Sequence, residues 1–370
     1  MRITGVELRR YALPLDPPFP AAWDPAPRQS AEATVVLVHT DEGITGVGSG
    51  DTMDGFERWA GLFLGQDPLA LERHVRVLGT IAFHAARYWP FEAALWDVAG
   101  KTAAKPVAAL LGEDGHATEL PAYASFGEAK RPDERAESAL RARDEGFRAV
   151  KVRIARSDVD AGLAAVRAVR QAAGESVEIA VDLNEGWRMP GDLSPSLARD
   201  VVDRLADELR ELGVLWLEEP LAAEDVRGLA ELRASSGLRI AGGEMARTVA
   251  ELLAYREADA LDVYQPDAVL AVGLLRGYEV GKAVMREGRW FTPHTWTNGV
   301  GLLANLHVAA AVGGGPYLEF PYDPPGWTAE RRDFLLAEPV SLEPGGVVRV
   351  PDAPGLGVRL ADDLERYRIA

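Results

Sequence analysis

Three acidic residues, Asp182, Glu218 and Glu244, each follow a short apolar segment, and each lies one strand-and-helix unit further along the chain. If these segments are neighbouring parallel strands, three carboxylates meet at one edge of a sheet, where their repulsion is costly unless a cation lies between them. All-oxygen ligation suits a hard divalent ion, Mg²⁺ best. An acid after a strand can also cap the next helix, but three in succession predict one Mg²⁺ per site.

A possible acid–base pair follows in the next two units. Asp267 and His294 close the segments "LDVYQPD" and "RWFTPH". An aspartate beside a histidine fixes its tautomer and raises its basicity, so we expect His294 to act as general acid or base with Asp267 behind it. The remaining histidines are expected to have no catalytic role: His39, His74, His84, His116 and His307.

Two cations stand together in "AVKVRI". Lys151 and Arg153 are two positions apart, so in a strand both side chains point to the same face. Arginine keeps its proton in essentially any protein environment, which leaves Lys151 as the one candidate for a second base. Ser125, Asn184 and Glu319 lie at the ends of other segments. Glu319, if protonated, could donate a hydrogen bond to a substrate oxygen.

These residues need a scaffold that brings strand ends together. Apolar strands and amphipathic helices alternate from about residue 120, and the eight expected strands are 120–127, 148–154, 177–184, 214–219, 238–244, 261–267, 289–294 and 316–320. Such alternation predicts parallel βαβ units, and eight strands favour a closed barrel whose chemistry lies at the carboxyl ends. We therefore expect an α/β fold, a (β/α)7β modified TIM barrel, over residues 119–334.

Residues 1–118 follow another pattern. Alternating strands with a turn at "TDEG" and a long helical segment at 91–112 predict an N-terminal α+β capping domain. The segment 14–29 holds six prolines in sixteen residues and is expected to be an ordered, functional loop. The strand-like tail, residues 335–370, is expected to pack back on this domain.

Bulk properties exclude several classes of protein. The net charge of −17 and the pI of 4.9 argue against a nucleic-acid partner. The sequence has no apolar run near the roughly 20 residues that span a bilayer and no signal-peptide pattern, so we expect a cytoplasmic protein without a membrane partner. With no cysteine, disulfides and thiolate chemistry are ruled out.

Taken in order, these motifs resemble the enolase superfamily, and within it the mandelate racemase subgroup. The matching stretches are "ALWDVAGKTAAKPVAALLG", "AVKVRI", "VDLN", "WLEEP", "GGE", "QPDA", "PHTW", "YLEF" and "PGLGV". The resemblance implies that a small carboxylate substrate chelates Mg²⁺ while its α-proton is removed to give an enediolate. It also implies a homo-oligomer, a dimer or an octamer.

The resemblance further implies that first-domain loops close over the barrel mouth and select the substrate. Candidate contacts are Trp23, Asp24 and Arg28 in the proline-rich segment, the turn "SGDTMD" at 49–54, and Trp296 in "PHTW". Together with Ser125 and Asn184, these residues would bind substrate.

The reaction is predicted from one position at which this chain differs from mandelate racemase. Mandelate racemase has a lysine where this chain has Arg153, and racemisation needs acid–base groups on both faces of the α-carbon. We therefore expect dehydration of an acid sugar, an aldonate or aldarate, to a 2-keto-3-deoxy acid. The alternatives are a racemase or epimerase of a 2-hydroxy acid that uses Lys151 and His294, a lactone cycloisomerase, and a catalytically silent barrel that binds sugar acids.

Overall fold

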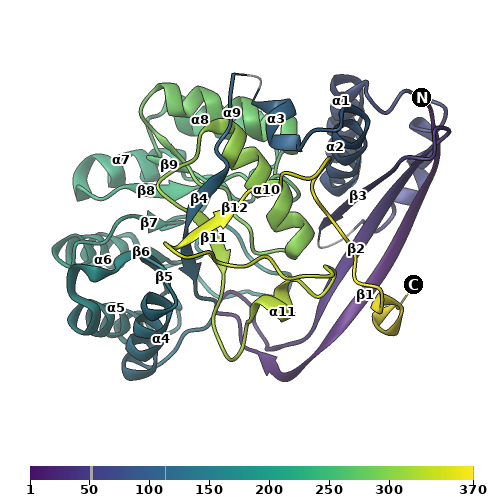
Figure 1. Cartoon of the computed structure of the whole chain (residues 1–370). Coiled ribbons are helices and arrows are strands. Elements are labelled where there is room, and N and C mark those ends of the chain that lie inside the picture. The colour runs from purple at the N-terminus through teal and green to yellow at the C-terminus, as the bar shows by residue number, and fades with distance from the viewer. Residues whose placement is uncertain (51–52, 113, 370) are drawn as a thin grey trace.

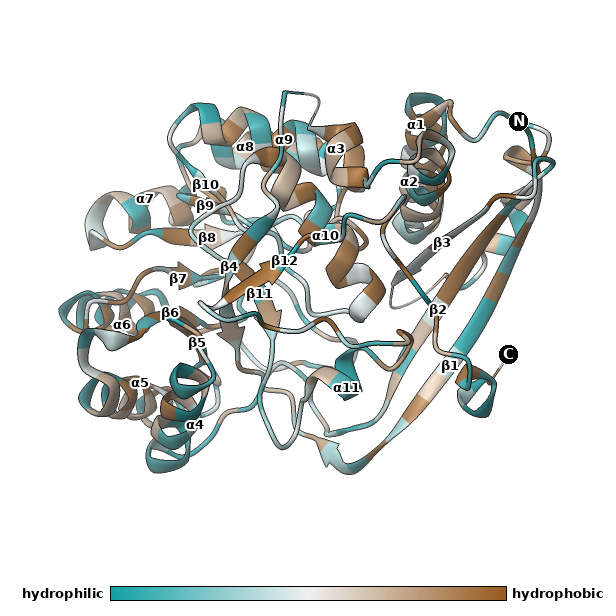
Figure 2. Ribbon diagram, viewed as in Figure 1, coloured by the Kyte–Doolittle hydropathy of each residue, from teal (hydrophilic) through white to brown (hydrophobic). Residues whose placement is uncertain are grey.

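An antiparallel sheet with its helices and a curled parallel sheet lie side by side in the computed structural model, which describes residues 1–50, 53–112 and 114–369 (Figure 1). The antiparallel sheet has the order β1-β2-β3, with β1 at Ile3–Phe19, β2 at Arg28–Thr40 and β3 at Thr45–Gly50. The predicted turn at residues 40–43 joins β2 to β3. In Figure 2, both brown and teal stretches occur along β1, a strand that buries only some of its side chains.

The prediction of a loop over residues 14–29 is wrong for most of that segment. β1 continues to Phe19 and β2 begins at Arg28, so only residues 20–27 connect the two strands. The pairing jumps from Pro14–Ser30 to Phe19–Arg28. Because β1 is the edge strand of its sheet, its prolines cost no inner hydrogen bonds and the irregular pairing accommodates them.

The helical segment at 91–112 is likewise broken in two. The helices of the first domain are α1 at Leu71–His84, α2 at Trp89–Ala103 and α3 at Val107–Leu111, and 3-10 turns occupy Phe56–Arg58 and Ala60–Leu62. Ala104 ends α2 in the left-handed region with φ 49°, and Pro106 precedes α3. A proline cannot continue the α2 hydrogen-bond ladder, which explains the break.

Glycines allow α2 to lie directly on β3. A Cβ atom on Gly46 would lie 2.1 Å from the main-chain oxygen of Ala94, and one on Gly48 would lie 2.0 Å from that of Pro90. No other residue fits such an approach without movement of the helix.

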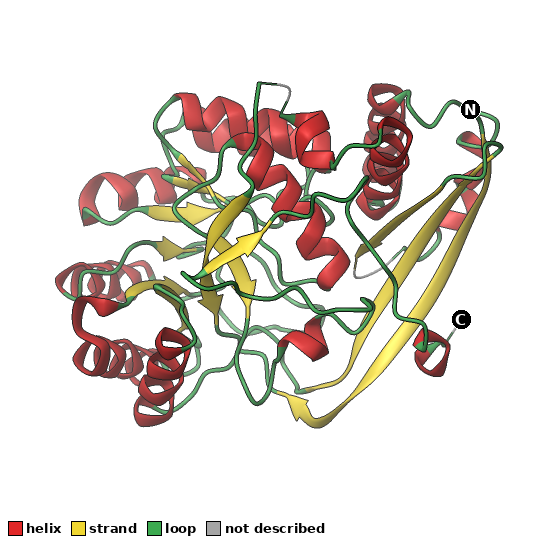
Figure 3. Ribbon diagram, in the orientation of Figure 1, coloured by secondary structure: helices red, strands yellow, loops and turns green. Residues whose placement is uncertain are grey.

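The second part is the predicted (β/α)7β barrel, which confirms the fold class. Its eight strands are β4 Glu119–Ser125, β5 Ala149–Arg153, β6 Glu178–Asp182, β7 Leu217–Glu218, β8 Ile240–Gly242, β9 Val263–Tyr264, β10 Trp290–Phe291 and β11 Leu318–Pro321. Its seven helices are α4 Pro132–Asp144, α5 Val159–Ala173, α6 Arg199–Glu211, α7 Val226–Ser236, α8 Val249–Glu257, α9 Leu274–Arg286 and α10 Gly299–Val312. Figure 3 shows the yellow strands inside and most of the red helices around them.

All eight strands pair in parallel in the order β10-β9-β8-β7-β6-β5-β4-β11. The two ends of this sheet are joined by Thr295, which follows β10. Its hydroxyl donates to the main-chain oxygen of Glu319 on β11 at 2.9 Å, and its main-chain N–H donates to the Glu319 carboxylate at 2.7 Å. Glu319, a predicted site residue, is therefore also the residue through which the two ends of the sheet are linked.

Side chains inside the barrel form layers along its axis, and these layers determine how far along the axis the site lies. A buried apolar layer consists of Tyr123, Ala149, Ala180, Trp216, Ala241 and Val263. The alanines leave room for the two aromatic rings, which meet edge to face with centroids 5.4 Å apart. Lys151 and Asp182 lie two residues further along β5 and β6, so they point to the same interior one layer nearer the carboxyl ends.

The tail touches both parts of the molecule. Strand β12, Val347–Arg349, pairs antiparallel with β4 of the barrel, and α11 occupies Ala329–Arg332. Further on, Arg368 bridges to Tyr11 and the N–H of Ile369 donates to the oxygen of Arg10. The packing of residues 335–370 on the first domain stays a prediction. The boundaries at 118 and 335 stay predictions.

Among the described residues, no helix is both long and apolar enough to span a membrane.

Candidate active site

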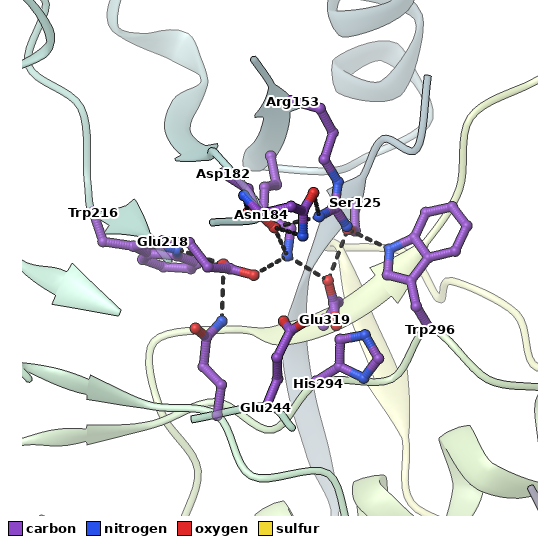
Figure 4. Close-up of polar contacts among 12 residues, drawn as sticks. Ser125, Arg153, Asp182, Asn184, Trp216, Glu218, Glu244, His294, Trp296 and Glu319 are labelled. Carbon is purple, nitrogen blue, oxygen red and sulfur yellow. Dashed lines mark hydrogen bonds and ion pairs between the residues drawn. The ribbon is translucent and has the colours of Figure 1, made fainter. Parts of the chain in front are cut away.

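The structure brings the three predicted metal ligands together. Asp182 ends β6, Glu218 ends β7, and Glu244 stands two residues after β8. Their side chains are at most 1% exposed, and one oxygen of each lies within 4.8 Å of the others. Figure 4 shows these carboxylates converging from separate strands. Parallel strands end at the same rim of a barrel, so the spacing in the sequence was enough to predict this cluster.

Uncharged N–H groups help to orient two of these carboxylates, Glu218 and Glu244. Glu218 Oε2 accepts from Trp216 Nε1 at 3.0 Å and from Gln265 Nε2 at 2.9 Å. Glu244 Oε1 accepts from Trp187 Nε1 at 2.7 Å, whereas its Oε2 has no hydrogen-bond partner. A buried carboxylate oxygen without a partner is costly, and a cation would satisfy it.

The charge of the cluster also fits a metal ion. Burial and the neighbouring Asp182 raise the pKa of Glu218 to about 7, and burial also raises the pKa of Glu244. Three carboxylate oxygens form the donor set that hard divalent cations prefer. Asp182, Glu218 and Glu244 would hold Mg²⁺ and leave further positions for substrate.

Lys151 and Arg153 face this cluster, as their spacing predicted. Lys151 Nζ is bonded to Glu218 and lies 3.3 Å from Asp182 and 2.7 Å from Glu319. Burial lowers the pKa of Lys151, but the charges of Glu218 and Glu319 outweigh it and raise that pKa above its usual range. In this arrangement Lys151 is a cation.

Arg153 is held more tightly still. Its guanidinium is bonded to Asp182 and donates to Asn184 Oδ1 at 2.8 Å and to the main-chain oxygen of Phe126 at 3.1 Å. It also stacks on Trp23, with 4.6 Å between the guanidinium carbon and the ring centroid. Arg153 therefore brings fixed positive charge to the cluster.

The predicted dyad is formed. His294 Nδ1 lies 2.9 Å from Asp267 Oδ2, and Asn305 Nδ2 donates to Asp267 Oδ1 at 3.1 Å. Burial lowers the pKa of His294, but Glu244, the bond to Asp267 and Glu319 together raise that pKa to about 10. A divalent cation among the carboxylates would offset their field and lower the pKa of His294.

Glu319 accepts hydrogen bonds from two neighbouring groups. Its carboxylate accepts from the Ser125 hydroxyl at 2.8 Å and from the main-chain N–H of Thr295 at 2.7 Å. Burial raises its pKa, but Lys151, His294 and Arg153 outweigh burial and lower that pKa to about 2. In this arrangement Glu319 accepts hydrogen bonds, and its role as a protonated donor stays a prediction. Trp296 Nε1 donates to the Ser125 hydroxyl at 2.7 Å.

The structure brings only some of the predicted loop residues to the site. Trp23 is buried against Trp296 with centroids 4.8 Å apart, and it covers Arg153. Asp24 and Arg28 instead bond to each other, and both line a separate pocket of about 350 Å³ that also contains Met189. Residues 51 and 52 of the expected turn "SGDTMD" lie outside the described residues.

Four residues of this site were not singled out from the sequence: Trp187, Trp216, Gln265 and Asn305. Trp216 precedes Glu218 by two positions in one strand, so the same-face rule could have found it. Asn305 lies inside the apolar helix α10 and is buried, and a buried amide needs a partner. Trp187 lies in an irregular connection, where no periodicity indicates its direction.

A (β/α)7β barrel with clustered carboxylates and a histidine–aspartate pair at its strand ends defines a class of metal-dependent acid–base enzymes. Residues 134–364 match the family model described as enolase C-terminal domain-like. The chain belongs to the enolase superfamily, which confirms the resemblance seen in the sequence.

Relatives of established activity cover most of the chain. It is 29% identical over 394 aligned residues to the D-galactarolactone cycloisomerase of Agrobacterium fabrum, covering 100% of this chain and 99% of that protein. It is 30% identical to the arabinonate dehydratase of Saccharolobus solfataricus over 75% of this chain and 70% of that protein.

One solved relative contains the expected metal. A racemase from Streptomyces coelicolor A3(2) with bound magnesium superposes with a TM-score of 0.83 at 26% identity, covering 99% of this chain and 100% of the other. The relatives are thus lyases and isomerases, and Mg²⁺ is a metal that this fold binds.

Proposed function

We propose that this protein dehydrates an acid sugar, an aldonate or aldarate, to a 2-keto-3-deoxy acid. One observation carries the proposal: a single histidine–aspartate dyad adjoins three clustered carboxylates, and an arginine occupies the position of a second base. The similarity to arabinonate dehydratase supports the same reaction.

Each group of residues in the site has its own role in removing the α-proton. The Asp267 carboxylate can only accept, so His294 Nδ1 carries its proton and Nε2 is left to take the substrate's α-proton. When bound by Asp182, Glu218 and Glu244, Mg²⁺ supplies positive charge that acidifies this proton. Lys151 and Arg153 add charge that stabilises the enediolate.

The second half of the reaction needs an acid. The electron pair of the enediolate expels the β-hydroxyl, which leaves as water after accepting a proton from the protonated His294. The resulting enol takes a proton at its β-carbon to give the 2-keto-3-deoxy acid. The sum is loss of one water without oxidation or reduction, so the chain needs no redox cofactor for it.

A lactone cycloisomerase is the second candidate, because the relative matched over the whole chain is the D-galactarolactone cycloisomerase. A racemase or epimerase needs a second base. Arg153 cannot serve, and Lys151 is bonded among three carboxylates.

The test is a screen of aldonic acids, aldaric acids and their lactones with purified protein and Mg²⁺. Semicarbazide detects 2-keto acid, and proton NMR in D₂O follows α-proton exchange and ring opening. Keto acid that disappears with EDTA supports dehydration. Ring opening without keto acid supports cycloisomerisation, and exchange without loss of water supports epimerisation. No turnover and no exchange with any compound would contradict the proposal and favour a silent barrel.

Assembly into a homo-oligomer, a dimer or an octamer, is part of the proposal. Phe83 and Leu193 are 86% and 93% exposed, and an interface is one way to cover such side chains. Light scattering of the eluted protein measures the mass, and a monomer of 39.9 kDa would contradict it.

A further inference from the structure

Trp187 reaches the metal cluster from the connection between β6 and α6, residues 183–198. Its indole N–H donates to Glu244 Oε1 at 2.7 Å. The other oxygen of Glu244 is buried and has no hydrogen-bond partner. The contact spans 57 positions of the chain, so it depends on how the connection is held over the barrel.

The connection is fixed immediately before Trp187. Glu185 is buried, and its carboxylate accepts from Arg156 Nε at 2.9 Å and from Arg188 Nη2 at 2.8 Å. At Gly186, a Cβ atom would lie 2.3 Å from Glu219 Oε1, so the backbone approaches the barrel as closely as a glycine allows. These contacts place the indole above Glu244.

Trp187 also packs against a hydrophobic cluster to which both the first domain and the barrel contribute. The buried residues of this cluster are Leu15, Phe19, Ala21, Trp23, Trp296 and Trp327. Trp23 in turn stacks on Arg153. Trp187 therefore bonds to a metal-ligand carboxylate and packs against the cluster that contains Trp23.

A comparison with Trp216 shows what is particular to Trp187. Both indoles donate to a metal-ligand carboxylate, Trp216 to Glu218 at 3.0 Å. Trp216 belongs to the buried apolar layer of the barrel interior. Trp187 stands on a connection, so its hydrogen bond couples the position of that connection to the orientation of Glu244.

We propose that Trp187 is a positioning residue of the metal site: its indole N–H holds one oxygen of Glu244 and leaves the unpartnered oxygen for the cation. Partners of this kind orient metal ligands, and their loss typically costs about 10–100-fold in metal affinity. The inference rests on the proposed function, because it takes the carboxylate cluster as the Mg²⁺ site.

The test compares Mg²⁺ binding by calorimetry in the unsubstituted protein, Trp187→Phe and Trp290→Phe. Phenylalanine keeps an aromatic ring but removes the N–H. Trp290 is the matched control, because it lies at the start of β10 with the Arg239 guanidinium stacked on it 4.1 Å from the ring centroid. We expect the Mg²⁺ dissociation constant to rise at least about 10-fold in Trp187→Phe and to stay unchanged in Trp290→Phe.

A spectroscopic measurement separates positioning from a general loss of structure. Tryptophan fluorescence should change on Mg²⁺ titration in the unsubstituted protein and in Trp290→Phe, and that change should be lost in Trp187→Phe. If Trp187→Phe does not fold, Arg188→Gln loosens the connection while leaving the indole, and it should weaken Mg²⁺ binding several-fold.

The outcomes distinguish the two proposals. If the unsubstituted protein binds no Mg²⁺, the proposed function fails. If it binds Mg²⁺ and Trp187→Phe binds equally well, the proposed function stands and the role of Trp187 is overturned. Unchanged affinity in Arg188→Gln, where that variant is needed, overturns it in the same way.

Discussion

The Asp267 carboxylate is fixed from both sides: its Oδ2 bonds to His294 Nδ1 at 2.9 Å, and its Oδ1 accepts the main-chain N–H of Val269 at 2.7 Å. The orientation of the imidazole is therefore set by the backbone that follows β9. Such a histidine is ready to move a proton at Nε2 without first reorienting.

Replacing that histidine tests the proposed acid–base role. In His294→Asn we expect kcat to fall by about 10²–10⁴-fold, the usual contribution of a general acid–base group, with the folded state retained. Steady-state assay on the substrate found by screening measures this, and His84→Asn, at an exposed position on α1, is the control. Full turnover in His294→Asn would rule the mechanism out.

Metal binding should stabilise the protein through the carboxylate cluster. A cation that binds only the folded state at 100 times its dissociation constant adds about 2.7 kcal/mol to the free energy of unfolding. We expect Mg²⁺ to raise Tm by several degrees and EDTA to reverse the rise, as followed by scanning fluorimetry. Glu244→Gln should lose most of the effect, and NaCl of equal ionic strength should not reproduce it. An equal rise in Glu244→Gln would place the binding elsewhere.

A buried ion pair should make Asp323 important for stability. Its carboxylate oxygens lie 3.0 Å from the Arg135 guanidinium and 2.7 Å from Lys130 Nζ, and Asp323 and Arg135 are almost completely buried. Removing one partner of a buried pair leaves an uncompensated charge, so Asp323→Asn should lose about 3–5 kcal/mol in urea unfolding. Glu338→Gln removes the exposed pair with Arg359 and should leave stability unchanged. Similar stability in both variants would contradict the argument.

The buried His307 should make stability depend on pH. Burial lowers its pKa to about 4, and its Nδ1 accepts the main-chain N–H of Ala108 at 3.2 Å. Between pH 6.5 and 4 the unfolded chain binds a proton at this position that the folded chain does not. The contribution is therefore fully present above pH 6.5 and is lost progressively as the pH falls towards 4.

The comparison variant is His307→Gln, whose amide has no such titration. Between pH 7 and pH 5 the unsubstituted protein should lose about 2 kcal/mol more stability than His307→Gln, measured by urea unfolding at each pH. His84→Gln should keep the dependence of the unsubstituted protein. Identical pH profiles for the unsubstituted protein and His307→Gln would show that His307 titrates alike in both states.

The sequence was informative wherever the barrel repeats. Each strand-and-helix unit returns the chain to the same rim, so Asp182, Glu218 and Glu244 could be grouped from spacing alone. It was uninformative where position depends on contacts between distant segments. The charge of Glu319 depends on Lys151, which comes from another strand, and the partner of Glu244 is an indole 57 positions away.

Local composition misled in the first domain. Prolines at 14, 17 and 18 indicated a loop, yet the chain continues as an edge strand because an edge needs hydrogen bonds on one side only. Asp24 and Arg28 stay predicted substrate contacts, and in the structure they lie four positions apart and bond to each other. A charge in a loop can be assigned to a ligand only once its neighbours are known.

The buried Asp97 ties the first domain to a segment that lies 259 residues further along the chain. Its carboxylate accepts from the N–H of Val47 at 2.8 Å and from the N–H of Leu356 at 2.8 Å. During synthesis the first half of the polypeptide leaves the ribosome long before residue 356. The first domain thus lacks one of its internal hydrogen-bond partners until residue 356 has been synthesised.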